Sequence, residues 1–199
     1  WSNIVRATYR HEDGGQPLTP VACGIDSGWN TKDTYDFCAK HPGVIPLKGA
    51  SSDLGSNGYR LVRLDDNRHS ADGQLLMHVG TDFWETDLQT RLDDKLANEP
   101  GSFTLSADSV SDIEFLAQLC NGVLKDSVDS RGNAKLLWMK KDENIPNDFR
   151  DAARYGLCLG RAWLEQNEGQ FPQRTQNTRP ASAVVYSGEQ RPDGRGWHD

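Results

Sequence analysis

Apolar residues in the first part of the chain fall into short runs that predict strands and helices in alternation. Residues 18–25 form an apolar, β-branched run of strand length, and residues 44–47 begin a second one. Between them, residues 31–40 carry apolar side chains on one helical face, with Asn30 or Thr31 as the cap. Two buried strands joined by a helix through short connections predict a parallel pair with a right-handed crossover.

The same periodicities continue as far as residue 166. Further strands are expected at 59–64, 75–81, 102–105 and 134–139, and further helices at 1–11, 83–97, 109–125 and 147–166. Gly, Ser, Asp and Asn fill most of residues 49–73, which predicts a long loop around the strand at 59–64. Strands that alternate with helices favour an α/β domain over residues 1–166.

The composition changes after residue 166. Residues 167–199 are rich in Pro, Gln, Gly and Arg and lack an apolar period, apart from the short run at 183–186. Such a composition predicts a flexible tail or linker. The apolar run could add a strand or dock on a partner.

Charge and composition narrow the classes of function. The 199 residues carry a net charge of −7 and only 36% are apolar, which argues against a surface that binds nucleic acid all over but leaves room for a local basic groove. The same balance fits a carboxylate site that holds cations. No apolar stretch is long enough to cross a bilayer, so no membrane partner is expected. The chain opens on Trp1 without a starting Met, so we expect it to be a piece of a longer protein.

The four cysteines predict buried thiols and no zinc site. Cys23, Cys38, Cys120 and Cys158 lie among apolar residues, and no two of them form a C-x-x-C pair. Closely paired ligands are the usual signature of structural zinc. We therefore expect four reduced, buried thiols.

Asp26 stands where a metal or catalytic carboxylate is expected in an α/β sheet. It follows the apolar run 18–25, so it lies at the carboxyl end of a buried parallel strand, where such sheets place their sites. Ser27 and Gly28 permit a tight turn after it. The alternative is that Asp26 only caps the following helix.

Asp148 and Asp151 lie three residues apart on the last helix and so share one of its faces. The opposite face carries Phe149, Gly156 and Gly160, which we expect to pack closely against the sheet. A helix held in this way can aim carboxylates at a fixed point. The alternative is that the two acids only favour the positive end of the helix dipole.

Two further residues are candidates at strand ends. Asp82 follows the strand at 75–81 and either joins the carboxylates or caps the next helix. Lys48 ends the strand that neighbours Asp26 and either contacts a phosphate or is solvated. Carboxylates that converge from separate elements suggest divalent-metal chemistry, and hard oxygen ligands select Mg²⁺ or Mn²⁺.

Five sequence motifs, in order, resemble those of a known family. They are A-C-G-I-D-S-G-W at 22–29, V-I-P-L-K-G-A-S at 44–51, H-V-G-T-D at 78–82, K-L-L-W at 135–138 and N-D-F-R-D-A-A-R-Y-G-L at 147–157. Their order and spacing over residues 4–165 are similar to the nuclease domain of the large terminase subunit of lambda-like tailed phages, part of a DNA-packaging motor. None of the motifs is specific alone, but the five in order are.

The resemblance implies a fold and an activity. It implies a ribonuclease-H-like mixed sheet flanked by helices, and an endonuclease that cuts concatemeric double-stranded DNA with two Mg²⁺ or Mn²⁺ ions during genome packaging. By position it implies catalytic roles for Asp26, Asp151 and Asp148, metal ligation by Asp26, Asp151 and Asp82, and DNA binding by Lys48. It also implies the terminase small subunit and the procapsid portal as partners, in the host cell cytoplasm.

The chain departs from the family pattern at several points. Trp29 replaces the second Gly of the family's D-[ST]-G-G turn, and Phe83 begins a run where small polar residues are usual. The family's first metal-binding Asp belongs to a strand expected upstream of Trp1. The 199 residues contain no G-x-x-x-x-G-K-[ST] phosphate-binding loop. We therefore expect a partial nuclease domain without its first strands, inactive alone.

Two other functions stay open from the sequence. One is a nuclease of the same fold with another role, of the resolvase or transposase type. The other is a catalytically silent structural or docking module.

Overall fold

The structure, a computed structural model, describes residues 7–9, 17–64, 73–93, 103, 105, 107–128 and 132–167. The chain divides into two compact units, one of Ala22–Gln170 and one that combines Trp1–Val21 with Phe171–Asp199. In the latter, Tyr9 and Leu18 form an isolated antiparallel bridge through two backbone hydrogen bonds of 2.8 Å. The expected helix at 1–11 is therefore wrong at Tyr9, because both backbone groups of this residue are used in the bridge. The rest of that helix, except 7–8, lies outside the described residues, as does the tail from 168 onward.

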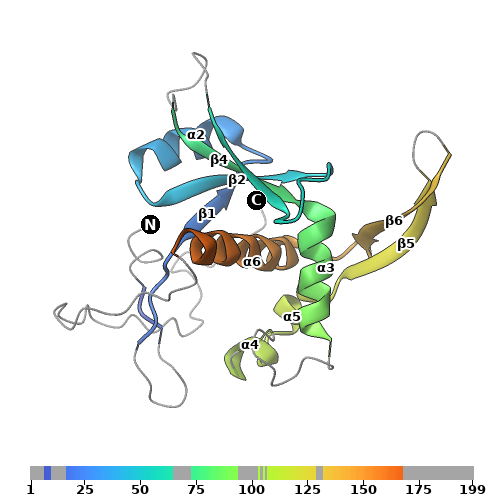
Figure 1. The fold of residues 1–199 in the computed structure, drawn as a ribbon. Helices are drawn as coiled ribbons and strands as arrows, with labels where there is room; N and C mark the ends of the chain where they lie inside the picture. Colours follow the sequence, from blue (N-terminus) through green and yellow to red (C-terminus); the bar gives the residue numbers. More distant parts are fainter. Residues whose placement is uncertain are drawn as a thin grey trace. The chain divides into compact units, whose positions relative to one another are not determined.

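The larger unit is built around a four-stranded mixed sheet (Figure 1). Its strands are β1 (Cys23–Asp26), β2 (Val44–Ala50), β3 (Tyr59–Arg63) and β4 (Leu75–Gly80), in the order β1-β2-β4-β3. β1, β2 and β4 are parallel and β3 is antiparallel to β4. The predicted parallel pair around helix α2 (Thr31–Lys40) is confirmed. β1 is shorter than the expected 18–25, in keeping with Pro20, which lacks the N–H that a strand ladder needs.

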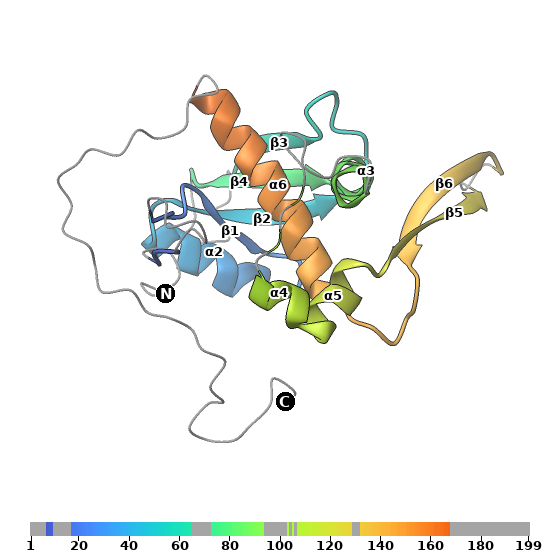
Figure 2. The ribbon, with the colours of Figure 1, turned by 90° about the horizontal axis from the view of Figure 1, so that it is seen from below.

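Helices cover both faces of this sheet, which confirms the expected mixed α/β architecture. Side chains alternate along β4, so Leu76 packs with Tyr35 of α2, whereas Met77 and Val79 pack with Tyr155 and Leu159 of the last helix. That helix, α6 (Asp148–Gln166), was expected at 147–166 and runs obliquely across the strands (Figure 2). Among the described residues, no helix is long and apolar enough to cross a membrane.

The buried face of α6 differs from the expected one. Phe149 and Gly156 are exposed, and a Cβ at Gly156 or Gly160 would meet nothing within 4 Å. The buried face consists of Arg150, Arg154, Tyr155, Cys158, Leu159 and Ala162. The apolar period did not reveal this face, because two of its first members are arginines. The prediction that the glycines allow close packing is wrong.

The segment between β4 and α6 also corrects the sequence analysis. Helix α3 (Thr81–Leu92) begins two residues before the expected 83, and residues 94–97 lie outside the described part. The helix expected at 109–125 is instead α4 (Ala107–Ser111), α5 (Ile113–Leu119) and the strand β5 (Gly122–Val128), which pairs antiparallel with β6 (Ala134–Lys140). Of the strand expected at 102–105, residues 103 and 105 are described and neither is in a strand.

The break in that helix has a local cause at Asn121. Its buried side chain donates to the carbonyls of Asp142 and Ile145 and accepts from the backbone N–H of Asp142. These bonds tie the end of α5 to the loop after β6. Val123 and Leu124 continue the helical period of α5, so the period alone did not mark the change to a strand.

The cysteines follow the prediction only in part. All four are free, and Cys38 and Cys158 are buried, but Cys23 is half-buried and Cys120 is exposed at the end of α5.

Candidate functional site

Asp26 and Asp151 lie where the end of β1 meets the first turns of α6. Asp26 is on the same face of β1 as Gly24, and a Cβ at Gly24 would lie 2.8 Å from Leu159 of α6, so this face looks at the helix. Asp151 precedes Leu159 on the same helix by about two turns. The two carboxylates are close enough that the charge of Asp26 contributes to raising the pKa of Asp151. The strand end and the helix thus bring both predicted acids to one place.

The turn after β1 fixes Asp26 without using it as a helix cap. One carboxylate oxygen accepts from the backbone N–H of Gly28 at 2.9 Å. Both the N–H and the hydroxyl of the buried Ser27 donate to the carbonyl of Leu47, at 2.8 and 2.7 Å. The N-cap of α2 is Asn30, whose side chain accepts from Asp33 N. The capping alternative for Asp26 is therefore wrong, and its carboxylate stays exposed at the strand end.

Asp151 carries a charge that its surroundings compensate only in part. Its carboxylate lies 3.1 Å from the guanidinium of Arg154, and its side chain is one third exposed. Burial raises the pKa of Asp151; Arg154 opposes this, and the negative charges of Glu85, Asp26 and Asp148 add to it. The net shift is upward. The negative charges of these three neighbouring carboxylates, rather than the burial, favour a cation beside Asp151.

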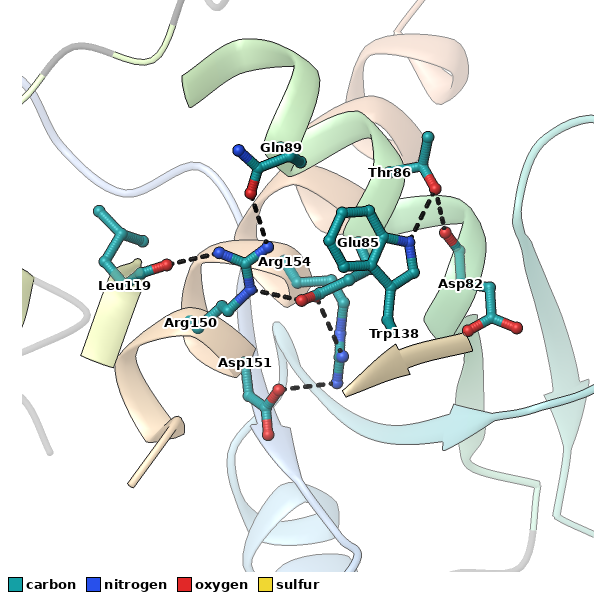
Figure 3. A network of polar contacts seen from close by, with 9 residues as sticks. All are labelled: Asp82, Glu85, Thr86, Gln89, Leu119, Trp138, Arg150, Asp151 and Arg154. Atoms are coloured by element: carbon teal, nitrogen blue, oxygen red, sulfur yellow. Dashed lines mark hydrogen bonds and ion pairs between the residues drawn. The ribbon is translucent and has the colours of Figure 1, made fainter. Parts of the chain in front are cut away.

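A buried network of charged side chains holds the start of α6 (Figure 3). Glu85 of α3 accepts from Arg150 and, at 3.4 Å, from Arg154. Arg150 also donates to the carbonyl of Leu119 at 2.6 Å and to Gln89 at 3.1 Å. All three charged residues are buried. The network ties α6 to α3 and α5 and so fixes the direction of Asp151.

Tyr155 lies one turn after Asp151 on α6 and packs against the sheet. Its side chain is buried. The hydroxyl lies over Gly49 of β2, which has no side chain; a Cβ at Gly49 would be 3.3 Å from this hydroxyl. Burial raises the pKa of Tyr155, and the charge of Asp26 raises it further. Sequence reasoning did not select Tyr155, Arg154 or Glu85. Tyr155 and Arg154 lie within the family motif at 147–157, so the motif could have pointed to them.

A cavity of about 310 Å³ opens beside Asp151. Residues of α3 (Thr81, Glu85), of β6 (Trp138) and of α6 (Asp151, Arg154) contribute to its lining. The Nε of Arg154 is buried and has no hydrogen-bond partner within the described part of the chain. Asp151 therefore stands at the edge of a hollow that has the buried cation of Arg154 in its wall.

The other predicted site residues lie around this place or away from it. Asp148 is exposed in the first turn of α6, and its charge acts on Asp151. Asp82 lies in the first turn of α3, where Gly80 is the N-cap, so the capping alternative for Asp82 is wrong. It lines a separate hollow with residues 50–54 and Phe83, and its carboxylate lies apart from that of Asp151 (Figure 3). Lys48 alternates with Leu47, which packs toward α6, so Lys48 is on the opposite face of the sheet from Asp26.

The donor set fits a magnesium-type ion in part. The described residues contain no group of three or more His, Cys, Asp or Glu that could hold a metal. Mg²⁺ is commonly bound by only one or two carboxylates, with water and substrate phosphate as its other ligands. Asp26 and Asp151 supply two such hard oxygen ligands from two fixed elements, which is enough for one ion and too few for two.

Comparison with known proteins identifies the family. The model of the family described as "Terminase large subunit gpA, endonuclease domain" matches residues 1–168. No curated protein and no solved structure gave a significant match. The match covers every element of the larger unit and confirms the resemblance drawn from the five motifs. The chain therefore belongs to the family of terminase large-subunit endonuclease domains.

Proposed function

We propose that this domain cuts double-stranded DNA during phage genome packaging, with Asp26 and Asp151 as the ligands of a divalent cation, Mg²⁺ or Mn²⁺. Membership in the endonuclease family supports the DNA substrate. The observation that best supports this cation site is that Asp26, at the carboxyl end of a parallel strand, lies close enough to Asp151 for their charges to interact.

The charges around Asp151 support cation binding. A carboxylate whose pKa is raised by burial and by neighbouring acids gains when a dication comes near, because the ion offsets several negative charges at once. Arg154 offsets one charge, yet the pKa stays raised. The site therefore has capacity for further positive charge, and a bound ion would lower this pKa.

The residues around the two acids have positioning roles in this proposal. Arg154, held by Glu85, orients Asp151, and Ser27 fixes the turn that presents Asp26. A bound divalent ion would supply water activation and charge stabilisation for phosphodiester hydrolysis. Tyr155 is buried where α6 packs on the sheet, so it would help to hold the helix that carries Asp151.

Asp148 and Asp82 extend the proposal toward two ions. Asp148 acts electrostatically on Asp151 and stands at the open side of α6, so it is the better candidate for an additional ligand. For Asp82 to bind the same ion or a neighbouring one, helix α3 would have to move, or a phosphate of the bound DNA would have to bridge the gap. We also propose that the sheet is of the ribonuclease-H-like type, which its mixed strand order and its helices on both faces support.

Partners and location follow from the family. We infer double-stranded DNA as the substrate, the terminase small subunit and the procapsid portal as protein partners, and the host cell cytoplasm as the place of action. The main alternative is a catalytically silent docking module. A nuclease of the resolvase or transposase type would share the site but cut another DNA structure.

Calorimetric titration with Mn²⁺ tests the site independently of cutting. The 199-residue chain should bind Mn²⁺, and Asp26→Asn and Asp151→Asn should each weaken binding strongly. Asp126→Asn, which changes an exposed acid on β5, is the matched control and should bind as the parent does. Unchanged binding in both site variants would refute the proposed ligands.

A plasmid-nicking assay tests the reaction. In the full-length protein that carries these residues, both site variants should lose Mg²⁺- or Mn²⁺-dependent cutting. The absence of metal binding together with the absence of cutting in the parent protein would favour the docking module.

A further inference from the structure

A row of three basic side chains crosses the sheet on the face opposite Asp26 and Asp151. Lys48 of β2 is the register partner of His78 of β4, and His78 is the partner of Arg60 of β3. Residues that are direct partners across strands project from the same face of a sheet. The three side chains are therefore neighbours, although they come from three separate segments of the chain.

The core contacts identify the face of this row. Leu76 and Val62, two positions from His78 and Arg60 along their strands, pack in the cluster with Tyr35 of α2. Met77, next to His78, packs in the cluster with α6. Alternation along the strands therefore puts the row on the α2 face of the sheet, two residues along each strand from the positions that α2 covers.

The positive charge of the row is not compensated by acids. Lys48 and Arg60 are exposed, and in the part of the chain that the structure describes, neither forms an ion pair or hydrogen bond with an acid. His78 is partly buried, and its burial, then Arg60 and then Lys48, lower its pKa. Neighbouring strands lie about 4.8 Å apart, so three positions in a row span about 10 Å. Lys48 and Arg60 therefore place two uncompensated positive charges on either side of His78, on a chain with a net charge of −7.

We propose that Lys48, His78 and Arg60 form a binding strip for the phosphate backbone of double-stranded DNA, separate from the cutting site. The inference rests on the proposed function for the identity of the polyanion. Each strand of a duplex carries a negative charge at every nucleotide, so a strip of this length can meet more than one phosphate of the backbone.

The position of the strip defines its role. The sheet separates it from Asp26 and Asp151, so a phosphate at Lys48 is not the one that is cut. The strip would therefore bind a part of the DNA that is distant from the scissile bond, either on the same duplex segment or on a second one. Loss of the strip should weaken DNA binding without changing Mn²⁺ binding.

Fluorescence anisotropy with a labelled duplex, in EDTA and over a salt series, tests the strip. The double variant Lys48→Gln/Arg60→Gln loses two cations, so the slope of log affinity against log salt should become shallower by about 2. The parent should accordingly lose about tenfold more affinity than the variant between 50 and 200 mM salt. Arg63→Gln is the matched control on β3: its side chain alternates to the other face and donates to the carbonyl of Gly73. It should keep the parent slope.

Two results would overturn the strip: a parent-like slope in the double variant, or His78 ring resonances that do not shift when duplex DNA is added to the parent chain. Asp26→Asn separates this inference from the proposed function. It should retain the parent salt slope, whatever its effect on metal binding and cutting. Full cutting by Asp26→Asn together with a shallow slope in the double variant would refute the proposed site and leave the strip standing.

Discussion

Asp151 and Arg154 form an ion pair of 3.1 Å, yet the pKa of Asp151 stays above its usual value. Burial outweighs the guanidinium, and Glu85, Asp26 and Asp148 add negative charge around the same carboxylate. Arg154 is shared, because it also binds Glu85. A carboxylate kept in a place that disfavours its charge costs stability, and such places cluster at functional sites.

The cost should be visible in the pH dependence of stability. The pKa of Asp151 is raised above 3.8 in the folded state, so the folded chain binds this proton more tightly than the unfolded chain does. The contribution of Asp151 is therefore most favourable below about pH 3.8 and is lost as the pH rises through the folded pKa. Asp151→Asn should be slightly more stable than the parent at pH 7, and this gain should disappear near pH 3. Urea unfolding from pH 3 to 7 measures it, with Asp126→Asn, at an exposed acid on β5, as the control.

Glu85→Gln should be strongly destabilising. Glu85 is the shared partner of two buried arginines, and its loss leaves their charges without a carboxylate in the interior. Breaking a buried pair in this way costs about 3–5 kcal/mol. The free energy of unfolding from denaturant titration measures the effect. Lys32→Gln, which breaks the exposed pair with Asp36 within α2, should cost less than about 1 kcal/mol. Equal small effects would mean that the buried network does not hold α6.

Two glycine substitutions should act in opposite directions. A Cβ at Gly122 would collide with the guanidinium of Arg150, so Gly122→Ala should destabilise the chain by about 1–3 kcal/mol. A Cβ at Gly156 of α6 would meet nothing within 4 Å, so Gly156→Ala should stabilise it by about 0.5–1 kcal/mol through helix propensity. Thermal unfolding of the two variants side by side measures both effects. A neutral or stabilising Gly122→Ala would contradict the packing around Arg150, and a destabilising Gly156→Ala would contradict the open space at that position.

Asp26→Asn should lower the pKa of Tyr155. Burial raises this pKa and the charge of Asp26 raises it further, so removal of that charge should move it back toward 10. Titration of the labelled tyrosine ring by NMR measures the change without any assay of cutting. Asp148→Asn is the control and should leave Tyr155 unaffected. An unmoved pKa in Asp26→Asn would mean that the strand end and the helix are not neighbours.

The sequence predicted most of the sheet and the position of both acids, and failed where polar contacts decide the structure. The apolar runs that became β2 and β4 are buried on both faces, which gives a strong local signal. The helix expected at 109–125 is interrupted at Asp112, and α5 ends at Leu119, shortly before Asn121. The side chain of Asn121 donates to the carbonyls of Asp142 and Ile145, residues distant in sequence. The buried face of α6 was missed for the same reason. Arg150 and Arg154 look like surface residues until Glu85 is brought to them by the fold.

The sequence pattern also could not predict on which face of the sheet each charged residue lies. Lys48 and Asp26 both stand near the ends of neighbouring parallel strands, which suggested a single site. The register shows Lys48 beside His78 and Arg60, on the side away from α6. Only the pairing of strands, and not the order of residues, determines which charges meet.

The two acids belong to the first strand and the last helix of the larger unit, and this has a consequence for synthesis on the ribosome. The sheet from β1 to β4 is complete in sequence long before α6 is made. A nascent chain can therefore pair its strands while Asp26 still lacks Asp151, and the proposed cation site would be complete only after α6 docks through Arg150 and Arg154. Under the proposed function, partly made chains would not yet cut DNA, because the last step is the formation of contacts between segments distant in sequence, which is slow.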